Sequence, residues 1–282
     1  MLEKLQYYLT FDFVKFAVVV GMLVALCAAL LGVTLVLKRY SMIGDGLSHV
    51  AFGAMTVAML LSVAPMYISL PVTILAAIML LRGGNQKLKG DAAIAVLSAS
   101  TLALGYLVLN IFSTQTNRSN LSGDVCKVLF GSTSILTLER SDVILCAVLA
   151  AVVIFVYAFF YNKIFSITFD EAFARATGTK VSAYNLMLAV IIAVVIVLAM
   201  NLVGALLITA LIVFPALCAM RLFKSFKAVI ISAAIISVCC AVIGLLVAIV
   251  YSTPVGCTIV AADLAVFLVC VLIDILKGGT KK

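Results

Sequence analysis

Asp45 and His49 are the residues whose types and spacing most directly suggest chemistry. They stand four residues apart in the stretch Ser41–Gly53, and His49 is the only histidine of the chain. At this spacing two side chains share one face of a helix. Carboxylate and imidazole both bind zinc or manganese, but one pair supplies only two ligands. Two copies meeting at a symmetry axis would supply four, so the sequence predicts a metal half-site that a second copy completes.

The elements that must position this pair are apolar helices. Of 282 residues, 66% are hydrophobic and 11% charged, whereas an ordinary soluble domain has roughly 45–50% apolar and about 25% charged residues. The apolar runs are continuous, which suits helices that span lipid, whereas barrel strands would alternate. We expect an all-α polytopic membrane protein with eight to nine transmembrane helices in a single bundle, forming one membrane-spanning domain over 1–282. The expected segments are 14–37, 46–64, 66–81, 92–112, 143–161, 184–200, 202–220, 228–251 and 257–276.

Asp45 and His49 adjoin the second of these segments. One interpretation is that Asp45 caps the helix and His49 is a polar residue near the membrane interface. Ionisable groups within a membrane are costly and usually functional, which favours the metal interpretation.

The apolar stretch 184–220 divides near Asn201. We expect Pro215 to bend or break its second part, and Gly204 to loosen the start of that part. One of the two segments would then be short or re-entrant, which would leave eight full spans.

Four small or proline residues mark expected helix breaks, namely Gly204, Pro215, Pro254 and Gly256. Such residues let backbones approach one another and can open a pathway through a bundle. Ordinary packing and a plain outer turn are the alternative interpretation for each of them.

The net charge of +8 is explained by topology and does not indicate nucleic-acid binding. Basic residues occupy alternate loops, whereas the connections near 65, 201 and 252–256 carry no charge. With nine spans, the positive-inside rule places the N-terminus outside and the C-terminus in the cytoplasm. The loop 113–142 is neutral and is expected outside. The basic residues of these alternate loops and of the C-terminal end are Lys38, Arg39, Arg82, Lys87, Lys89, Lys163, Arg175, Lys180, Arg221, Lys224, Lys227, Lys277, Lys281 and Lys282.

The basic cytoplasmic loop 163–182 contains a second informative stretch, Thr168–Gly178. It is amphipathic and alanine-rich and ends in glycine, which predicts a short helix with a glycine stop. It could lie on the membrane surface, or it could dock a cytosolic partner. No P-loop for nucleotide binding occurs in the chain, and its eight cysteines form no CxxC pair.

Taken in order, these features resemble the zinc, manganese and iron permeases of the ATP-binding-cassette (ABC) transporter superfamily, with the zinc-uptake members closest in appearance. The resemblance covers nearly the whole chain. It rests on Leu37–Met42 with Gly44, Asp45, Ser48 and His49; Asp91–Ile94; Leu129–Gly131; Phe169–Gly178; Val203–Ala205 with Pro215 and Ala216; and Pro254–Gly256.

The resemblance implies a homodimer in a bacterial cell membrane, bound to a cytosolic ABC ATPase and supplied by an extracellular metal-binding protein. No cofactor is implied beyond the transported Zn²⁺, or Mn²⁺ or Fe²⁺, which would meet Asp45 and His49. The chain itself would not be an enzyme. Coupling to the ATPase is assigned to the segment that contains Asp170, Glu171, Ala172, Ala174 and Gly178.

The chain departs from the family pattern at several places. Phe52–Ala54 stands where many members have Leu-Pro-Gly, and Lys127 stands near a position where many have histidine. Asp263 is a carboxylate within the last span, which we interpret as a packing residue, with a secondary ion contact as the alternative. An ion-coupled carrier without an ATPase, a channel and a regulatory scaffold remain open from sequence, and an intramembrane enzyme is the least favoured alternative.

Overall fold

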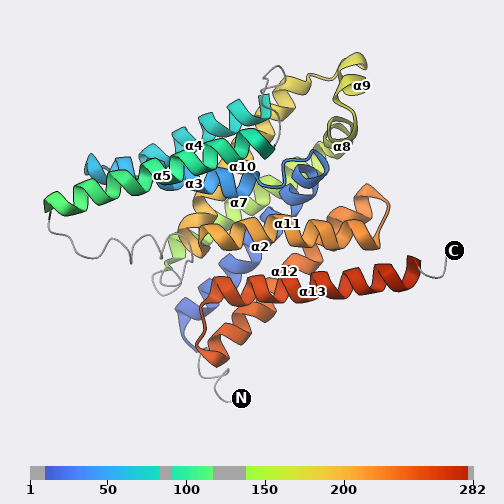
Figure 1. Cartoon of the computed structure of the whole chain (residues 1–282). Helices are drawn as coiled ribbons and strands as arrows, with labels where there is room; N and C mark the ends of the chain where they lie inside the picture. Colours follow the sequence, from blue (N-terminus) through green and yellow to red (C-terminus); the bar gives the residue numbers. More distant parts are fainter. Residues whose placement is uncertain (1–9, 83–90, 117–137, 279–282) are drawn as a thin grey trace.

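The computed structural model describes residues 10–82, 91–116 and 138–278, which form one bundle of long helices (Figure 1). No strand occurs in these ranges. The helices are α2 (Asp12–Leu37), α3 (Ile43–Leu60), α4 (Pro65–Arg82), α5 (Asp91–Thr116), α7 (Arg140–Phe159), α8 (Tyr161–Phe169), α9 (Glu171–Ala176), α10 (Val181–Val203), α11 (Ala205–Leu222), α12 (Phe226–Tyr251) and α13 (Val255–Gly278).

Eight of the described helices are long and apolar enough to cross a membrane, which agrees with the expected fold class. The ninth is α4, whose apolar part, Pro65–Leu81, is shorter. The prediction that the short helix lies within 184–220 is wrong, since α10 and α11 both have the length and hydropathy of a span. The apolar part of α4 is confined between Pro65, a residue suited to the first helical turn, and the charged Arg82.

Gly204 separates α10 from α11. Its φ of 94° and ψ of 153° belong to a region of backbone conformation that is open essentially to glycine alone. The chain therefore reverses with one intervening residue. The break expected near Asn201 lies three residues later, because Asn201 continues α10 and bonds its side chain to the Val197 carbonyl.

Pro215 does not break its helix. It lies buried within α11, which continues for seven residues beyond it. The expectation of a break there is wrong: the ring is accommodated in the bundle, although proline removes one backbone donor.

The central helices approach closely where glycine replaces a larger side chain. A Cβ on Gly32 of α2 would clash with the Ile212 carbonyl oxygen of α11. A Cβ on Gly53 of α3 would lie 2.9 Å from the Thr101 carbonyl oxygen of α5. Such contacts are how membrane helices pack without a hydrophobic driving force between them. They fix α3 against its neighbours.

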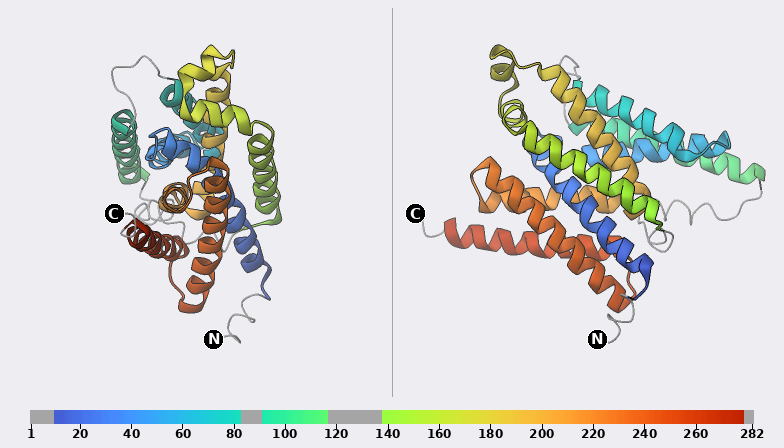
Figure 2. Two further views of the ribbon diagram at one scale, coloured as in Figure 1. Left: turned by 90° about the vertical axis from the view of Figure 1, so that its right-hand side faces the viewer. Right: turned by 180° about the vertical axis from the view of Figure 1, so that it is seen from behind.

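One face of the bundle is less covered than the rest. Only 17% of the spanning window is buried in α5 and in α13, against 67% in α2 and α3. Both exposed helices lie along the front of the view in Figure 1, and the turned view of Figure 2 places them at the same edge. The exposed apolar surfaces of α5 and α13 are therefore available to contact lipid or another protein.

The two ends of the bundle differ in charge. At the end where α8 and α9 project (Figure 1), described residues include many cations. At the other end, the short connections 61–64 and 252–254 carry no charge. The cations at the α9 end include Lys38, Arg39, Arg82, Lys163, Arg175, Lys180, Arg221, Lys224 and Lys227, whereas Asp12, Lys15, Glu139, Arg140 and Asp142 lie at the other end.

Candidate metal half-site and coupling helix

Asp45 and His49 lie on one face of α3, as their spacing predicts. The His49 Nε2 is 3.4 Å from an Asp45 carboxylate oxygen. The other carboxylate oxygen is 3.5 Å from the Ser98 hydroxyl of α5. The Asp45 side chain is 39% exposed and that of His49 14%. The His49 Nδ1 is buried without a hydrogen-bond partner in the described part of the chain. The pair therefore retains the capacity to bind a further group.

Asp45 does not cap its helix. Met42 occupies the N-cap position of α3, without a side-chain cap bond, and Asp45 lies within the first turn. The carboxylate is thus directed to His49 and Ser98 instead of the helix end. This placement removes the simplest structural explanation for Asp45.

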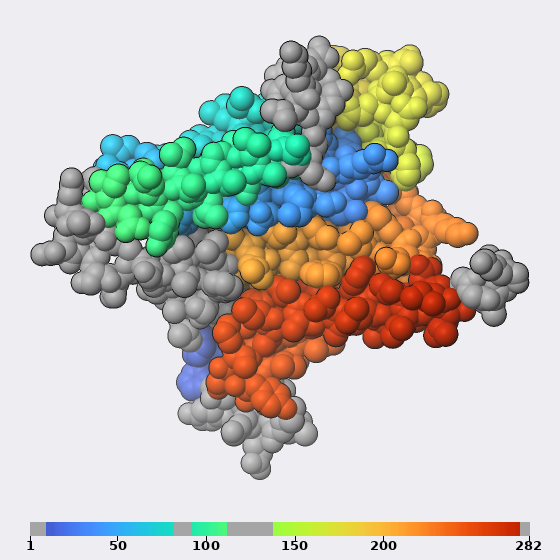
Figure 3. All heavy atoms as spheres, viewed as in Figure 1, coloured from blue at the N-terminus to red at the C-terminus, as the bar shows by residue number. Residues whose placement is uncertain are grey.

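The pair lies within a stripe of partly exposed positions on α3. Met42, Asp45, His49, Gly53 and Val57 are half-buried or exposed, whereas most other positions between them are buried. In Figure 3, atoms of α3 are visible between α5 and the orange and red helices, on the face along which α5 and α13 lie. Part of α3, the helix that carries the pair, is thus visible on this face of the molecule.

Within the described part of one chain, Asp45 and His49 have no third His, Cys, Asp or Glu ligand beside them. No group of three or more His, Cys, Asp or Glu side chains that could hold a metal ion is found among the described residues. Two ligands do not hold a bare divalent cation, because tetrahedral sites need four and octahedral sites six.

The predicted short helix with a glycine stop is present as α9. The Asp170 carboxylate accepts a hydrogen bond from the Phe173 backbone N–H at 2.9 Å and caps the helix start. Beyond the helix end, Gly178 has φ +82°, and the N–H groups of Gly178 and Thr179 bond back to Arg175 and Ala174. This is the Schellman arrangement.

The helix α9 has one attached face and one open face. Ala174 is fully buried and packs with Ile167 and Val181. Asp170, Glu171 and Ala172 are exposed, and the Phe173 ring is 62% exposed. An exposed aromatic ring on a projecting helix is a feature that the sequence reasoning did not single out, although Phe173 stood within the predicted stretch.

Lys38 links α9 to the ends of two spanning helices, and the sequence analysis missed this role. Its ammonium group is 2.8 Å from Glu171 Oε1 and 2.8 Å from Asn185 Oδ1. The Asn185 amide also donates to the same Glu171 oxygen at 3.1 Å. The Lys38 side chain is only 8% exposed. Partial burial acts to raise the pKa of Glu171, but the hydrogen bond and charge of Lys38 lower it below its usual value.

The four expected helix breaks are not gathered at the half-site. Gly204 and the turn with Pro254 lie at the bundle end opposite α9, and Gly256 is buried near the start of α13. Of the four, Pro215 lies within α11, the helix that packs against the start of α3.

Asp263 is 1% exposed, and both its carboxylate oxygens lack a hydrogen-bond partner within the described residues. It lies away from Asp45 and His49, near Cys240. The position of Lys127 and the Leu129–Gly131 sequence lie outside the described residues, so their predicted roles have no structural counterpart here.

A bundle of long apolar helices with a short helix projecting from one end is typical of the membrane-spanning subunits of transporters. Comparison with known proteins makes this specific. A family model described as the ABC 3 transport family matches residues 10–274, and the chain belongs to this family. It is the membrane-spanning subunit of an ABC metal importer and not itself an enzyme, since ATP hydrolysis belongs to a separate chain.

Two relatives and one solved structure illustrate the likeness. The manganese import system permease protein ScaB of Streptococcus gordonii is 27% identical over 95% of this chain and 93% of its own. The high-affinity zinc uptake system membrane protein ZnuB of Haemophilus influenzae is 28% identical over 89% and 94%, respectively. PsaBC from Streptococcus pneumoniae in complex with Fab is similar with a TM-score of 0.81, 26% identity, and coverage of 96% and 95%.

Proposed function

We propose that this chain imports a divalent first-row metal ion, zinc by preference, through a path that Asp45 and His49 of two copies line together. Manganese or iron is the alternative cargo. The observation that carries the proposal is the two-ligand half-site on α3, whose Asp45 side chain is 39% exposed and lies beside Ser98 of the little-covered helix α5. A single copy cannot complete the site, whereas a symmetric pair brings two carboxylates and two imidazoles together.

The second copy fits the face formed by α3, α5 and α13. The exposed apolar side chains of α5 and α13 would bury one another or lipid, and the polar pair on α3 would then be enclosed. Enclosure matters because carboxylates in a low dielectric attract a cation strongly, and removing water from the ion requires replacement ligands.

The expected preference for zinc follows from ligand chemistry. Nitrogen and oxygen sites bind Zn²⁺ more tightly than Mn²⁺ in the general affinity order of divalent metals. The relatives are named for both metals. Geometry and metal supply decide between such cargoes in a cell, so transport has to be measured for each metal.

The cytosolic ATPase is expected to dock on α9. Its open face presents Glu171, Ala172 and Phe173, while Ala174 holds the helix against α8 and α10. The hydrogen bonds of Lys38 connect Glu171 to the turn that leads from α2 into α3. Asp45 lies in the first turn of α3, three residues after Met42, its N-cap residue. A movement of α9 would thus be transmitted to Asp45 and His49 through the ion pair between Glu171 and the nearly buried Lys38.

The charge asymmetry of the bundle supports the proposed orientation. The cationic end with α9 and the C-terminal helix end would face the cytoplasm of a bacterial cell. The opposite end, where Gly204, Pro254 and Gly256 lie, has few cations and would then face outwards and receive the extracellular metal-binding protein. Alternating access would expose the half-site to each end in turn.

The test is transport by the chain reconstituted in vesicles with its ATPase partner. We expect ATP-dependent accumulation of Zn²⁺, with slower accumulation of Mn²⁺, and none when ATP or the ATPase is left out. Accumulation by vesicles that contain this chain alone would contradict the proposal and indicate an ion-coupled carrier. Equal uptake by wild type and an Asp45→Ala, His49→Ala double variant would contradict the ligand assignment.

A further inference from the structure

A cavity lies at the cationic end of the bundle, between the α7–α8 junction and the start of α10. Its volume is about 400 Å³, within the range of about 300–1,000 Å³ that small-molecule sites occupy. It is lined from one side by Phe160 and Lys163, and from the other by the segment Gly178–Lys180 and the first turns of α10. The metal pathway uses none of these cavity-lining side chains.

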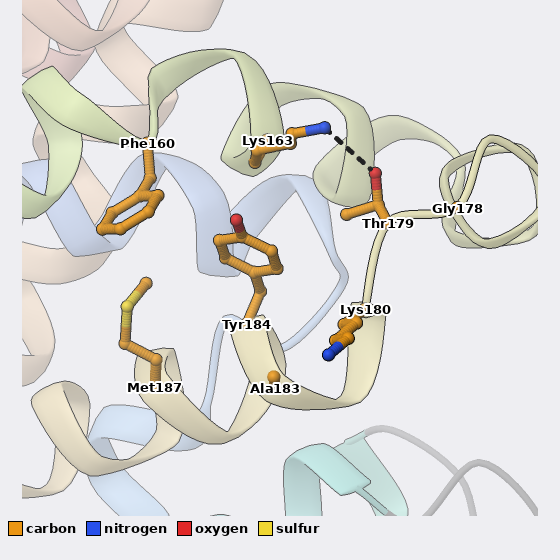
Figure 4. A pocket seen from close by; sticks show the side chains of 8 residues that line it. All are labelled: Phe160, Lys163, Gly178, Thr179, Lys180, Ala183, Tyr184 and Met187. Atoms are coloured by element: carbon orange, nitrogen blue, oxygen red, sulfur yellow. Dashed lines mark hydrogen bonds between the residues drawn. The ribbon is translucent and has the colours of Figure 1, made fainter.

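The cavity has a cationic end and an apolar end, as Figure 4 shows. Lys163 and Lys180 lie at the end near Gly178, and Lys163 Nζ is 3.4 Å from the Thr179 hydroxyl. Phe160 and Met187 lie at the other end. Met187 is seven residues after Lys180 along α10, so at a rise of 1.5 Å per residue it lies about 10 Å deeper in the bundle.

The two lysines are not neutralised within the described part of the chain. None of the described lining residues is acidic, and neither lysine has an ion pair among the described residues. By contrast, Lys38 and Arg221 are each paired with a carboxylate. Two ammonium groups without an ion pair in the described ranges, one of them beside the Thr179 hydroxyl, attract anions.

An aromatic ring lies between the two ends. Tyr184 is half-buried, and its ring meets that of Phe160 edge to face at 5.6 Å between centroids. A tyrosine with an apolar body and a polar tip is suited to the boundary between lipid headgroups and acyl chains. The cavity therefore changes from polar to apolar in the direction in which a membrane does.

We infer that this cavity binds the headgroup of an anionic phospholipid, with the phosphate between Lys163 and Lys180 and the start of an acyl chain along Phe160 and Met187. Basic pockets between spanning helices on the cytoplasmic side are recognised sites for anionic lipids. A bound lipid would connect the α7–α8 junction to the start of α10, directly beside the segment that carries α9. The inference does not depend on which metal is transported.

The experiment titrates the purified full-length chain with dioleoylphosphatidylglycerol or dioleoylphosphatidylcholine and counts bound lipids by native mass spectrometry. A larger groove of about 700 Å³ beside Lys227 can also hold lipid, so variants are compared with wild type instead of counting all lipids. We expect Lys163→Gln with Lys180→Gln to weaken phosphatidylglycerol binding about thirtyfold at one site, about fivefold per lysine. Lys163→Arg with Lys180→Arg should retain it.

The matched control removes two charges at the same end of the molecule outside the cavity. Arg175 and Lys224 are exposed and do not line the cavity. Arg175→Gln with Lys224→Gln should leave phosphatidylglycerol binding within about twofold of wild type. An equal loss in this control would show a general charge effect and overturn the proposal, as would unchanged binding in the Lys163 and Lys180 double variant.

A variant that fills the cavity separates a lipid from a free phosphate. Ala183 lines the cavity, and Ala183→Phe fills it while keeping both lysines. We expect this variant to lose phosphatidylglycerol, and inorganic phosphate at millimolar concentration not to displace the lipid from wild type. Displacement by phosphate, or full lipid binding by Ala183→Phe, would show that no acyl chain occupies the cavity. Thermal unfolding of each variant without added lipid checks that the fold is intact.

Discussion

The half-site on α3 and the link at α9 are both built from an acid and a base, but they are completed differently. Lys38 has two acceptors within 2.8 Å, Glu171 and Asn185, which also bond to each other. His49 has one oxygen of Asp45 at 3.4 Å and leaves its Nδ1 without a partner in the described residues. The first set is satisfied within one chain and the second is not.

This difference separates a structural connection from a binding site. Buried polar groups in proteins are normally hydrogen-bonded, because an unsatisfied one costs about 1–3 kcal/mol. A network that satisfies itself stabilises a geometry. A pair that leaves polar atoms without a partner is instead available for a ligand, which in the proposed function is a cation shared with the matching pair of a second copy.

The largest expected effect is at the half-site. Loss of a partner of a metal ligand commonly lowers affinity or activity about 10–100-fold, so loss of a ligand itself should cost more. Asp45→Asn and His49→Gln should each reduce metal uptake more than about 100-fold in vesicles that contain the ATPase. Both substitutions keep the side-chain size, so membrane insertion should be unchanged.

Ser98→Ala is the matched comparison, because its hydroxyl is 3.5 Å from Asp45 and contributes no ligand in this account. It should reduce uptake less than about tenfold. Loss as large as that of Asp45→Asn would make Ser98 a ligand and would enlarge the half-site beyond two residues.

The link at α9 should respond asymmetrically to loss of either partner. The Lys38 side chain is 8% exposed and that of Glu171 46%. Glu171→Ala leaves a nearly buried cation with one acceptor and should destabilise the protein by about 1–3 kcal/mol. Lys38→Met keeps an apolar stem and leaves Glu171 to water, so it should cost below about 1 kcal/mol.

Thermal unfolding in detergent measures this order, and the same variants should hydrolyse ATP with reduced transport when assembled with the ATPase. A larger loss of stability in Lys38→Met than in Glu171→Ala would show that the Lys38 ammonium group is hydrated in the folded protein. Normal transport per ATP in both variants would remove the link from the coupling path.

The packing of α3 against α5 provides a smaller effect. A Cβ on Gly53 would meet a backbone oxygen at 2.9 Å, and Gly53→Ala should destabilise the protein by about 1–3 kcal/mol. Gly21 is the control, since a Cβ there would lie 3.7 Å from a Leu245 methyl group. Gly21→Ala should be neutral or stabilise by up to about 1 kcal/mol. Equal effects on the unfolding temperature would contradict the close approach of the two helices.

The smallest effect is the pH dependence of the link. The pKa of Glu171 is lowered from 4.5 in the folded protein, so the folded state favours its charged form. Its contribution is present above the unfolded pKa and is lost as the pH falls through the folded pKa. The difference in unfolding temperature between wild type and Glu171→Gln should be constant above about pH 5.5 and shrink below that. A difference that grows on acidification would contradict the sign.

Much of the fold could be predicted because hydropathy is a local property. The nine apolar segments coincide with spanning helices or with α4 to within a few residues. The short helix was misplaced because proline and glycine mark a possible break without determining one. Pro215 stays inside α11, whereas Gly204 supplies the turn alone.

The site residues could be predicted where they lie close together in the sequence. Asp45 with His49, and Asp170 with Gly178, lie within one helical segment each, so spacing places them. Lys38 and Glu171 are 133 residues apart. Their contact depends on how the helices pack, which spacing along the chain does not give. Nothing in a single sequence indicates that an ordinary positive residue in a basic loop is nearly buried.

Metal stoichiometry of the purified permease tests the central claim most directly. Equilibration with Zn²⁺, followed by elemental analysis and determination of the subunit number, should give one ion per two chains with nitrogen and oxygen ligands. The ion should be absent from an Asp45→Asn, His49→Gln double variant that still dimerises. One ion bound per chain, or an ion retained by the double variant, would contradict the account.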